Sequence, residues 1–319
     1  EQKQHSNFTS EQGLESMYDY SLAHLKWRNS MANPKIGIIG GTGLYDIEGL
    51  KKKETVTVQT PFGNPSDGYL TGELDGISVV FLPRHGLGHR LLPHELNFRA
   101  NMYGFKKLGV EWIISVSAVG SMKEEIEPLH MVLPDQFVDR TRNRIDTFFG
   151  GGIAAHVPFA QPICPQLSAK LHMKIEKLGF SVHKGGTYLC MEGPQFSTKA
   201  ESTIYRSWTV DVIGMTNLQE AKLAREAEMC YATIALVTDY DCWREEEDNL
   251  SIEMIIDNLT KNTEKVKEVI RTVIPEVPTM HRNCPCCNAL NNAIITQPDM
   301  ISPQVKKDLE IIIGKHLKE

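Results

Sequence analysis

The stretch Lys35-Ile-Gly-Ile-Ile-Gly-Gly-Thr-Gly-Leu44 decides the fold class of this 319-residue chain. Residues 36–39 are rich in isoleucine and carry no polar side chain. This pattern is typical of a strand buried on both faces. Glycines directly after a strand let backbone N–H groups come close to a ligand at the strand end. The stretch therefore predicts a buried strand that is followed by a turn able to hold an anion.

Four further apolar runs repeat this strand pattern, and helix-like stretches alternate with them. The runs cover residues 77–82, 112–116, 131–133 and 233–237, and the helical patterns cover residues 93–108, 164–178, 202–208, 218–227 and 251–274. Ser251 is a suitable N-cap for the helix expected over residues 251–274, which carries an apolar stripe on one face. This alternation predicts an α/β fold with a mostly parallel sheet flanked by helices.

The two ends of the chain differ from this alternating core. Residues 1–33 are polar and weakly patterned, so we expect an N-terminal tail there. Residues 34–275 form the expected single catalytic domain. Residues 276–319 are expected to form an irregular C-terminal extension, which ends in an amphipathic helix over about 303–317.

The overall composition excludes several classes of protein. Hydrophobic residues make up 41% and charged residues 23%, which argues against disorder, and the net charge of −6 gives no basic surface for nucleic acid. No run approaches the ~18 apolar residues of a membrane helix, and no signal-peptide pattern is present. Seven cysteines at scattered spacings indicate reduced thiols. We therefore expect a cytoplasmic protein, with the nucleus as a further compartment, and no membrane partner.

Three cysteines near the C-terminus, Cys284, Cys286 and Cys287, lie close to His281. Structural zinc sites usually combine a C-x₂₋₄-C pair with a second, distant pair. The C-x-C-C spacing is tighter, and the sequence offers no second pair of this kind. The expectation is therefore incidental thiols and no metal.

Anion-binding chemistry recurs at three successive strand ends. In open α/β sheets, ligands bind beyond the carboxyl ends of the strands. The hydroxyls of Thr42 and Ser117, the guanidinium of Arg84, the imidazole of His85 and the backbone amide of Ala118 all follow predicted strands and suit an oxyanion such as phosphate. Each piece alone is more simply a tight turn or a surface pair, but their repetition favours an anion site.

The fourth strand end carries acidic residues instead. Asp239 and Asp241 are two residues apart on an extended strand end, so they are expected to face the same side. Two close carboxylates disfavour double ionisation, so the pKa of one should rise, and it could then protonate a leaving group. Helix capping or a salt bridge is the competing interpretation.

The glycine-rich turn does not match the common nucleotide-binding motifs. With Gly41 and Gly43 as the first two glycines of G-x-G-x-x-G, the third position is Asp46, and no Gly-Lys-[Ser/Thr] occurs. This disfavours a nicotinamide-dependent dehydrogenase. A non-catalytic nucleotide-binding module stays open, and it would bind ligand without phosphate-dependent turnover.

Six motifs resemble those of the S-methyl-5′-thioadenosine phosphorylases of eukaryotes, within the trimeric type of purine nucleoside phosphorylase family. They are Lys35-Ile-Gly-Ile-Ile-Gly-Gly-Thr-Gly-Leu44, Thr60-Pro-Phe-Gly-Asn-Pro-Ser-Asp67, Arg84-His-Gly86, Asp135-Gln-Phe-Val-Asp-Arg-Thr141, Met191-Glu-Gly-Pro-Gln-Phe-Ser197 and Thr238-Asp-Tyr-Asp-Cys-Trp243. The resemblance implies an α/β domain around a distorted β-barrel, usually a homotrimer. It also implies the phosphorolysis of 5′-methylthioadenosine to adenine and 5-methylthioribose 1-phosphate, a step of purine and methionine salvage, with phosphate as co-substrate and no cofactor.

The same resemblance implies a role for individual residues. The residues that match the phosphate site are Thr42, Arg84, His85, Ser117, Ala118 and Thr216. Met215 matches the residue beside the ribose hydroxyls, Phe196 the aromatic on the base, and Ser197 a position near the purine. The residues that match the apolar 5′ pocket are His156, Ile252, Ile255 and Ile256. Asp239 and Asp241 are the expected catalytic residues, with Asp239 supplying or stabilising a proton at N7 of the purine.

Two comparisons within the family bear on substrate choice. Related 6-oxopurine phosphorylases have Glu and Asn where this chain has Ser197 and Asp239, so a 6-aminopurine is expected; a broader or 6-oxopurine phosphorylase is the alternative. The chain also departs from the family pattern at Gly214 (often Asn), Ser117 (usually Thr), Gln195 (Arg) and Asn217-Leu-Gln219 (commonly Thr-Val-Pro). These departures are expected to alter phosphate affinity and substrate breadth, and to leave the reaction class unchanged.

Overall fold

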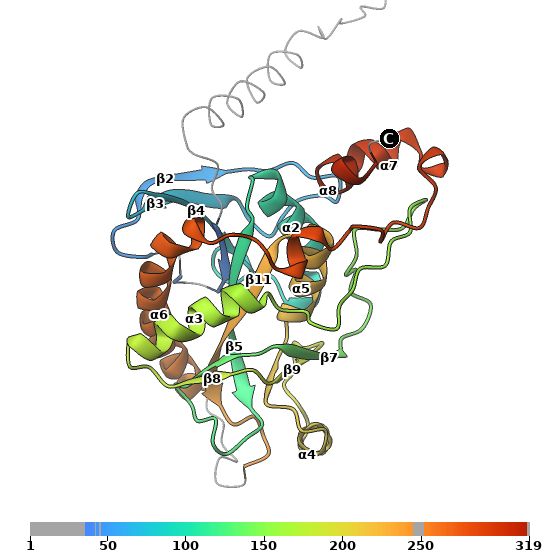
Figure 1. Ribbon diagram of the computed structural model, residues 1–319. Helices are drawn as coiled ribbons and strands as arrows, with labels where there is room; N and C mark the ends of the chain where they lie inside the picture. Colours follow the sequence, from blue (N-terminus) through green and yellow to red (C-terminus); the bar gives the residue numbers. More distant parts are fainter. Residues whose placement is uncertain (1–35, 42, 45, 245–251, 318–319) are drawn as a thin grey trace, which may run out of the picture.

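An 11-stranded mixed sheet forms the centre of the part of the protein that the structure describes (Figure 1). The structure is a computed structural model and describes residues 36–41, 43–44, 46–244 and 252–317. The main strand order is β2-β3-β4-β1-β5-β10-β9-β7; β11 pairs with β5 and β6, and β6 also pairs with β8. The strands are β1 (Ile36–Gly40), β2 (Lys51–Val56), β3 (Tyr69–Leu74), β4 (Ile77–Pro83), β5 (Trp112–Ser121), β6 (Met131–Leu133), β7 (Gln136–Arg140), β8 (Val182–Lys184), β9 (Thr187–Met191), β10 (Val212–Gly214) and β11 (Cys230–Asp239).

Parallel pairing predominates at the centre of this sheet, as the sequence predicts. β1 pairs in parallel with β4 and β5, β5 with β11, and β9 with β7 and β10. β1 and β11 are buried at every residue, which explains their continuous apolar runs. The antiparallel edge β2–β3–β4 was not predicted, because β2 is exposed and reads Lys-Lys-Lys-Glu-Thr-Val.

β5 is the strand on which the candidate site depends. One of its edges pairs with β11 from Trp112 to Gly120. On the other edge, pairing with β1 stops at Ser115 and pairing with β10 starts at Gly120. Between them, residues 116–119 have no strand partner on that edge within the described residues. The sheet therefore has a gap in its middle at which backbone groups can meet a ligand.

Helices cover the sheet in two groups (Figure 1). α3 packs against α6 and α2 against α5, and α3, α5 and α6 all contact β11. The α-helices are α2 (Phe98–Lys107), α3 (Pro165–Lys177), α4 (Lys199–Ser207), α5 (Asn217–Glu226), α6 (Ile252–Val273), α7 (Pro303–Asp308) and α8 (Glu310–Ile313). The 3-10 helices are η1 (Pro93–Glu95), η3 (Ile274–Thr279), η4 (Pro285–Asn288), η5 (Pro298–Met300) and η6 (Gly314–His316). None of the helices described is both long enough and apolar enough to cross a membrane.

Two predicted helices are interrupted in the structure. The helix expected over residues 93–108 splits into η1 and α2, because Asn97 caps the second part by accepting a hydrogen bond from the Ala100 amide. The helix expected over about 303–317 breaks at Leu309 into α7, α8 and η6. The expected N-terminal tail, residues 1–33, lies outside the described residues.

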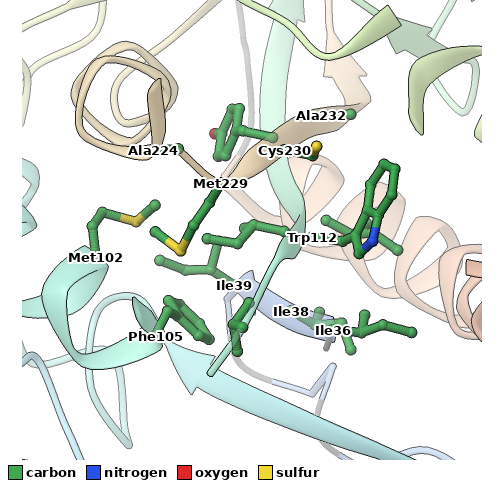
Figure 2. Close-up of a cluster of buried hydrophobic side chains, with 14 of the residues drawn as sticks. Ile36, Ile38, Ile39, Met102, Phe105, Trp112, Ala224, Met229, Cys230 and Ala232 are labelled. Atoms are coloured by element: carbon green, nitrogen blue, oxygen red, sulfur yellow. The ribbon is translucent and has the colours of Figure 1, made fainter. Parts of the chain in front are cut away.

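The C-terminal segment shares the core of the rest of the chain. Leu290, Ile301, Leu309 and Ile312 are buried in the same cluster as β1, and the Tyr103 hydroxyl of α2 donates to a carbonyl oxygen of α7. Figure 2 shows another part of this cluster, in which Ile36, Ile38 and Ile39 of β1 gather with Met102 and Phe105 of α2. Residues 276–317 thus complete the core over α2.

Candidate active site

Arg84 follows β4 and is buried against Glu220 of α5. Its Nε lies 2.5 Å from Oε1 of Glu220, and one terminal nitrogen lies 3.1 Å from Oε2. The guanidinium also donates to the Val116 carbonyl at 2.8 Å and to the Ser115 hydroxyl at 2.7 Å. These bonds use four of the five N–H donors of an arginine. The Arg84 guanidinium, which the sequence analysis assigns to phosphate, thus makes two of its hydrogen bonds to Glu220. One N–H group remains for an anion.

A buried hydrogen-bond network joins β5, α5 and β11 behind this pair. The Ser117 hydroxyl donates to Oδ1 of Asn217 at 2.6 Å. The amide nitrogen of Asn217 donates to the hydroxyls of Ser115 and Tyr231, both at 2.8 Å, and Tyr231 donates to Glu220 at 2.8 Å. Asn217, a departure from the family pattern, is therefore the centre of the network that supports β5.

Ala118 and Thr216 border the gap in the sheet. Ala118 is exposed within an otherwise mostly buried strand, so β5 is uncovered at that residue. Thr216 is the N-cap residue of α5, and its side chain makes no capping hydrogen bond to the helix. The first amides of α5 therefore lack a side-chain acceptor from their N-cap residue, and a helix N-terminus in this state favours an anion.

His85 is oriented by the backbone. Its Nδ1 lies 2.8 Å from the Leu91 carbonyl oxygen, which can only accept, so Nδ1 carries the proton and Nε2 is an acceptor in the neutral ring. Its ring stacks on His89 at 4.2 Å between centroids. Burial and the neighbouring charge of Arg84 lower the pKa of His85 to about 4. A neutral His85 accepts a hydrogen bond through Nε2, which suits the hydroxyl of a monohydrogen phosphate.

Asp239 and Asp241 lie at the end of β11 beside Gly120. A Cβ atom on Gly120 would lie 3.1 Å from Oδ1 of Asp239 and 3.3 Å from Cβ of Asp241, so a larger residue would crowd both acids. Asp239 accepts hydrogen bonds from the Thr238 hydroxyl at 2.6 Å and from the Asp241 amide at 2.8 Å. The Ser202 hydroxyl of α4 donates to Asp241 at 2.6 Å. The structure thus brings the two predicted acids together, but not on an extended strand end as predicted: β11 ends at Asp239, and Asp241 lies in the following turn with a φ of 54°.

Burial raises the pKa of Asp241 above the ordinary value of a carboxyl group, and hydrogen bonds from Ser202 and Ser197 act in the opposite direction. The prediction that one acid of the pair has a raised pKa is confirmed for Asp241. The largest cause is loss of hydration, whereas the sequence argument invoked the proximity of a second carboxylate.

Arg144 connects the segments around Glu192 and Met215. Its side chain is only 2% exposed and pairs with Glu192 at 3.1 Å. It donates to the backbone carbonyls of Met215 at 2.5 Å and of Glu192 at 2.6 Å, and to the side chain of Gln219 at 3.1 Å. Arg144 thereby fixes Met215, the residue assigned to the ribose. Sequence reasoning missed it because Arg142-Asn-Arg144 belongs to no recognisable pattern.

Phe196 and Ser197 lie on the loop between β9 and α4. The Phe196 side chain is 63% exposed, so its ring remains available to a planar ligand. The Ser197 carbonyl oxygen accepts a hydrogen bond from the Cys242 thiol at 3.2 Å. This bond places the loop next to Asp241.

The first turns of α6 lie against the end of β11. The Asn258 side chain donates to the Thr238 carbonyl at 2.8 Å, directly before Asp239. Ile255 is half-buried one turn earlier, on the same face as Asn258, whereas Ile256 is 56% exposed. Farther along the helix, Val266, Val269 and Ile270 are fully buried in the core. The predicted apolar stripe thus has two parts, and the first part borders the candidate site.

His156 is not brought to the other predicted residues of the 5′ pocket. It is exposed, and its amide donates to the Ala293 carbonyl of the C-terminal segment at 2.9 Å. In Figure 1 the segment that follows β7 lies on the right of the view and α6 on the left. One chain alone therefore does not place His156 beside Ile255.

Two predicted site residues cannot be placed, and Ser251, the expected N-cap of α6, also lies outside the described residues. Thr42 lies outside the described residues, and the side chain of Ile252, the first residue of α6, does as well. Sequence reasoning also missed a group of buried polar residues that hold the site together. They are Ser115, Ser202, Glu220 and Tyr231; Glu220 and Ser202 lie in helices whose sequence patterns emphasised their apolar faces, and only the fold shows their partners.

Comparisons with known proteins show the family of this chain. The family model described as "Phosphorylase superfamily" matches residues 35–275. The S-methyl-5′-thioadenosine phosphorylase of Geobacter sulfurreducens is 57% identical over 283 residues, which cover 88% of this chain and 99% of that protein. That of Koribacter versatilis is 57% identical over 285 residues, covering 89% and 97%.

Solved structures show the same likeness. A methylthioadenosine phosphorylase from an Antarctic soil metagenomic library superposes with a TM-score of 0.85 at 46% identity, covering 88% of this chain and 99% of that one. The Schistosoma mansoni enzyme in its apo form gives 0.73 at 30%, covering 88% and 97%. The motifs suggest eukaryotic relatives, yet the Geobacter sulfurreducens and Koribacter versatilis proteins, at 57% identity, are more similar to this chain than the Schistosoma mansoni enzyme at 30%. The chain belongs to the S-methyl-5′-thioadenosine phosphorylase family of the phosphorylase superfamily.

Proposed function

We propose that the protein catalyses the phosphorolysis of 5′-methylthioadenosine to adenine and 5-methylthioribose 1-phosphate. The observation that carries this proposal is the position of the Asp239–Asp241 pair at the end of β11, beside the gap in the β5 edge. Acids for the base and donors for an anion thus lie near the same end of the neighbouring strands β5 and β11. The relatives with 57% identity carry the name of this activity.

Phosphate is the nucleophile in this proposal. The backbone at Ser117 and Ala118, the N-terminus of α5 at Thr216 and the remaining N–H of Arg84 provide donors. The Nε2 atom of neutral His85 accepts a hydrogen bond from the hydroxyl of monohydrogen phosphate. Thr42, carried over from the family, completes the set. A phosphate oxygen then attacks C1′ of the ribose as the bond from C1′ to N9 breaks, so no cofactor is needed.

The acid pair acts on the leaving base. The electron pair of the broken bond moves into the purine, and a proton at N7 lets adenine leave as a neutral molecule. Asp239 supplies or stabilises that proton. The Asp241 carboxyl accepts a hydrogen bond from the Ser202 hydroxyl, and the Asp241 amide donates one to Asp239. A positioned proton donor of this kind contributes typically about 10²–10⁴-fold to the rate.

The substrate site is completed around these groups. Phe196 stacks on the base, Ser197 lies near it, Met215 contacts the ribose, and the start of α6 with Ile252, Ile255 and Ile256 forms the apolar wall for the methylthio group. His156 belongs to the same pocket in this proposal and is supplied by an adjacent subunit of a homotrimer. The products feed purine and methionine salvage in the cytoplasm.

The test is adenine release from 5′-methylthioadenosine, with and without phosphate, beside adenosine and inosine. We expect release that requires phosphate and is far faster with methylthioadenosine than with inosine. Asp239→Asn should lower kcat/KM by about 10²–10⁴-fold, whereas Asp75→Asn, in the exposed turn after β3, should leave it unchanged. Phosphate-independent release, faster inosine turnover or a fully active Asp239→Asn enzyme would contradict the proposal.

A further inference from the structure

Four cysteine thiols gather in the interior, at the opposite end of β11 from Asp239. The sulfur atoms of Cys164, Cys230, Cys284 and Cys286 all lie within 4.8 Å of one another, and all four residues are buried. Cys164 is the N-cap residue of α3, Cys230 is the first residue of β11, and Cys284 and Cys286 lie at the start of η4. Three segments that are distant in sequence meet at this cluster.

The spacing of the sulfur atoms suits a shared cation. Sγ of Cys284 lies 3.3 Å from Sγ of Cys230 and 3.7 Å from Sγ of Cys164. Four thiolates around one zinc ion, with bonds of about 2.3 Å, lie about 3.8 Å apart, whereas a disulfide needs about 2.05 Å. All seven cysteines of the chain are free. The two distances from Cys284 are thus close to the separation of zinc ligands, and the four cysteines carry no cross-link of their own.

Two arginines place positive charge beside the cluster. A terminal nitrogen of Arg225 lies 3.9 Å from Sγ of Cys286. Arg282 lies next to Cys230, and its Nε is buried without a hydrogen-bond partner. A zinc ion with four thiolates carries a net charge of −2, which two guanidinium groups balance. N–H donors aimed at ligand sulfurs are the outer contacts that stabilise such a site.

One ligand position also suits the thiolate form that metal binding requires. Cys164 lies at the N-terminus of the 13-residue helix α3, where the helix dipole stabilises negative charge.

We propose that Cys164, Cys230, Cys284 and Cys286 bind one structural zinc ion per chain. A set of four cysteines is closed to substrate, so its role is to hold segments together. The expectation of incidental thiols considered only neighbours in the sequence. The missing second pair is Cys164 and Cys230, which lie 120 and 54 residues before Cys284.

Bound zinc fixes the C-terminal segment to the start of β11 and to α3. Figure 2 shows Cys230 with Trp112 in the core cluster, and the two residues are register partners of β11 and β5. Because the full length of β11 separates this cluster from Asp239, zinc loss is expected to lower the melting temperature and to leave the KM values unchanged.

The first experiment is zinc analysis of the full-length protein, purified without chelator in a reductant that does not bind metal. We expect one zinc ion per chain, and Cys286→Ser should lose most of it. Cys287→Ser is the matched control, because the Cys287 sulfur faces the carbonyl oxygens of Arg282 and Cys284, at 3.0 Å each, and is not among the four. Equal zinc in both variants would overturn the proposal.

A second measurement does not depend on the folding of a variant. Wild-type protein stripped of metal is titrated with Co²⁺, and we expect the visible bands of a tetrahedral site together with thiolate-to-cobalt charge transfer, which Zn²⁺ then abolishes. Absence of these bands, or iron in place of zinc in the purified protein, would refute the assignment. So would an intact mass of the denatured, unreduced protein that shows hydrogen loss from disulfides among the four cysteines.

Discussion

The Glu220 carboxylate holds the Arg84 guanidinium by two hydrogen bonds, of 2.5 and 3.1 Å, inside the protein. Both side chains are almost completely buried. The pair lies behind the unpaired stretch of β5, because Arg84 also donates to the Val116 carbonyl. The geometry of the candidate phosphate site thus depends on a glutamate that does not itself face the ligand.

Replacing Glu220 by glutamine should leave Arg84 as a buried charge without its partner. We expect a loss of about 3–5 kcal/mol in the free energy of unfolding and a higher KM for phosphate, measured by urea denaturation and initial rates. Glu73→Gln is the control, because Glu73 pairs with the exposed Lys52 and its loss should cost about 1 kcal/mol or less. A Glu220→Gln enzyme with wild-type stability and phosphate KM would contradict this account.

Removing the Ser202 hydroxyl should change the acidity of Asp241. The bond from Ser202 to Asp241 lowers the pKa of that carboxyl, while burial raises it. Ser202→Ala should therefore move the pKa of Asp241 further up, and the limb of the kcat/KM–pH profile that this group controls should shift to higher pH.

The control for this pH profile is Ser207→Ala, which removes an exposed hydroxyl from the last turn of the same helix. Its profile should coincide with that of the wild type. A Ser202→Ala profile that is unshifted would show that Asp241 does not control the measured rate.

Tyr188 leaves no room for a side chain at Gly214. This explains why the chain lacks the asparagine that is common there in the family. A Cβ atom on Gly214 would lie 1.9 Å from the Tyr188 hydroxyl oxygen. Gly214→Ala should thus destabilise the protein by about 1–3 kcal/mol through overpacking. In the double variant with Tyr188→Leu, the cost of the alanine should be smaller, as a double-mutant cycle of unfolding free energies would measure.

A suitable control for the overpacking is Gly314→Ala. There the added Cβ atom would lie 3.6 Å from its nearest neighbour, an ordinary contact. We expect a change of about 0.5 kcal/mol or less. Additive effects of Tyr188→Leu and Gly214→Ala would rule out the proposed steric coupling between the two positions.

Glu226 at the end of α5 should make stability depend on pH. Burial raises its pKa to about 7, while hydrogen bonds from the Phe148 amide and the Thr147 hydroxyl oppose the shift. A folded-state pKa above the unfolded value means that the protonated carboxyl is favoured in the fold. Its stabilising contribution is complete below about pH 4.5 and is lost as the pH rises through about 7.

Glu226→Gln removes this titration. The wild type should lose up to about 3 kcal/mol more unfolding free energy than the variant between pH 5 and pH 8. Urea unfolding of both proteins at the two pH values measures the difference. Parallel pH dependence of the two proteins would show that Glu226 is ionised throughout this range.

The sequence predicted five largely buried strands, because a strand covered on both faces is apolar at successive positions, but it missed β3, β9 and β10, which are also largely buried. The runs over 36–39, 77–82 and 131–133 lie in β1, β4 and β6. Edge strands such as β2 escaped prediction, since an exposed strand of Lys-Lys-Lys-Glu carries no hydrophobic signal. Asp239 and Asp241 were found because they are close in the sequence and at a strand end.

The residues that the sequence could not reveal are those with distant partners. Glu220 lies 136 residues from Arg84, and Arg144 lies 71 residues from the Met215 carbonyl that it binds. The four cysteines are a similar case. A local sequence pattern reveals interacting residues only when they are close together in the chain. These residues are distant in the sequence, and the topology of the sheet brings them into contact.

The gap in the β5 edge has a consequence for how this enzyme family can diversify. Main-chain N–H donors at residues 116–119 do not depend on any particular side chain, so every substitution except one by proline keeps them. The side chains expected to contact the base and the 5′ group can each be replaced by a single mutation. In the proposed mechanism, evolution can therefore alter which nucleoside is cleaved while the main-chain phosphate site stays the same.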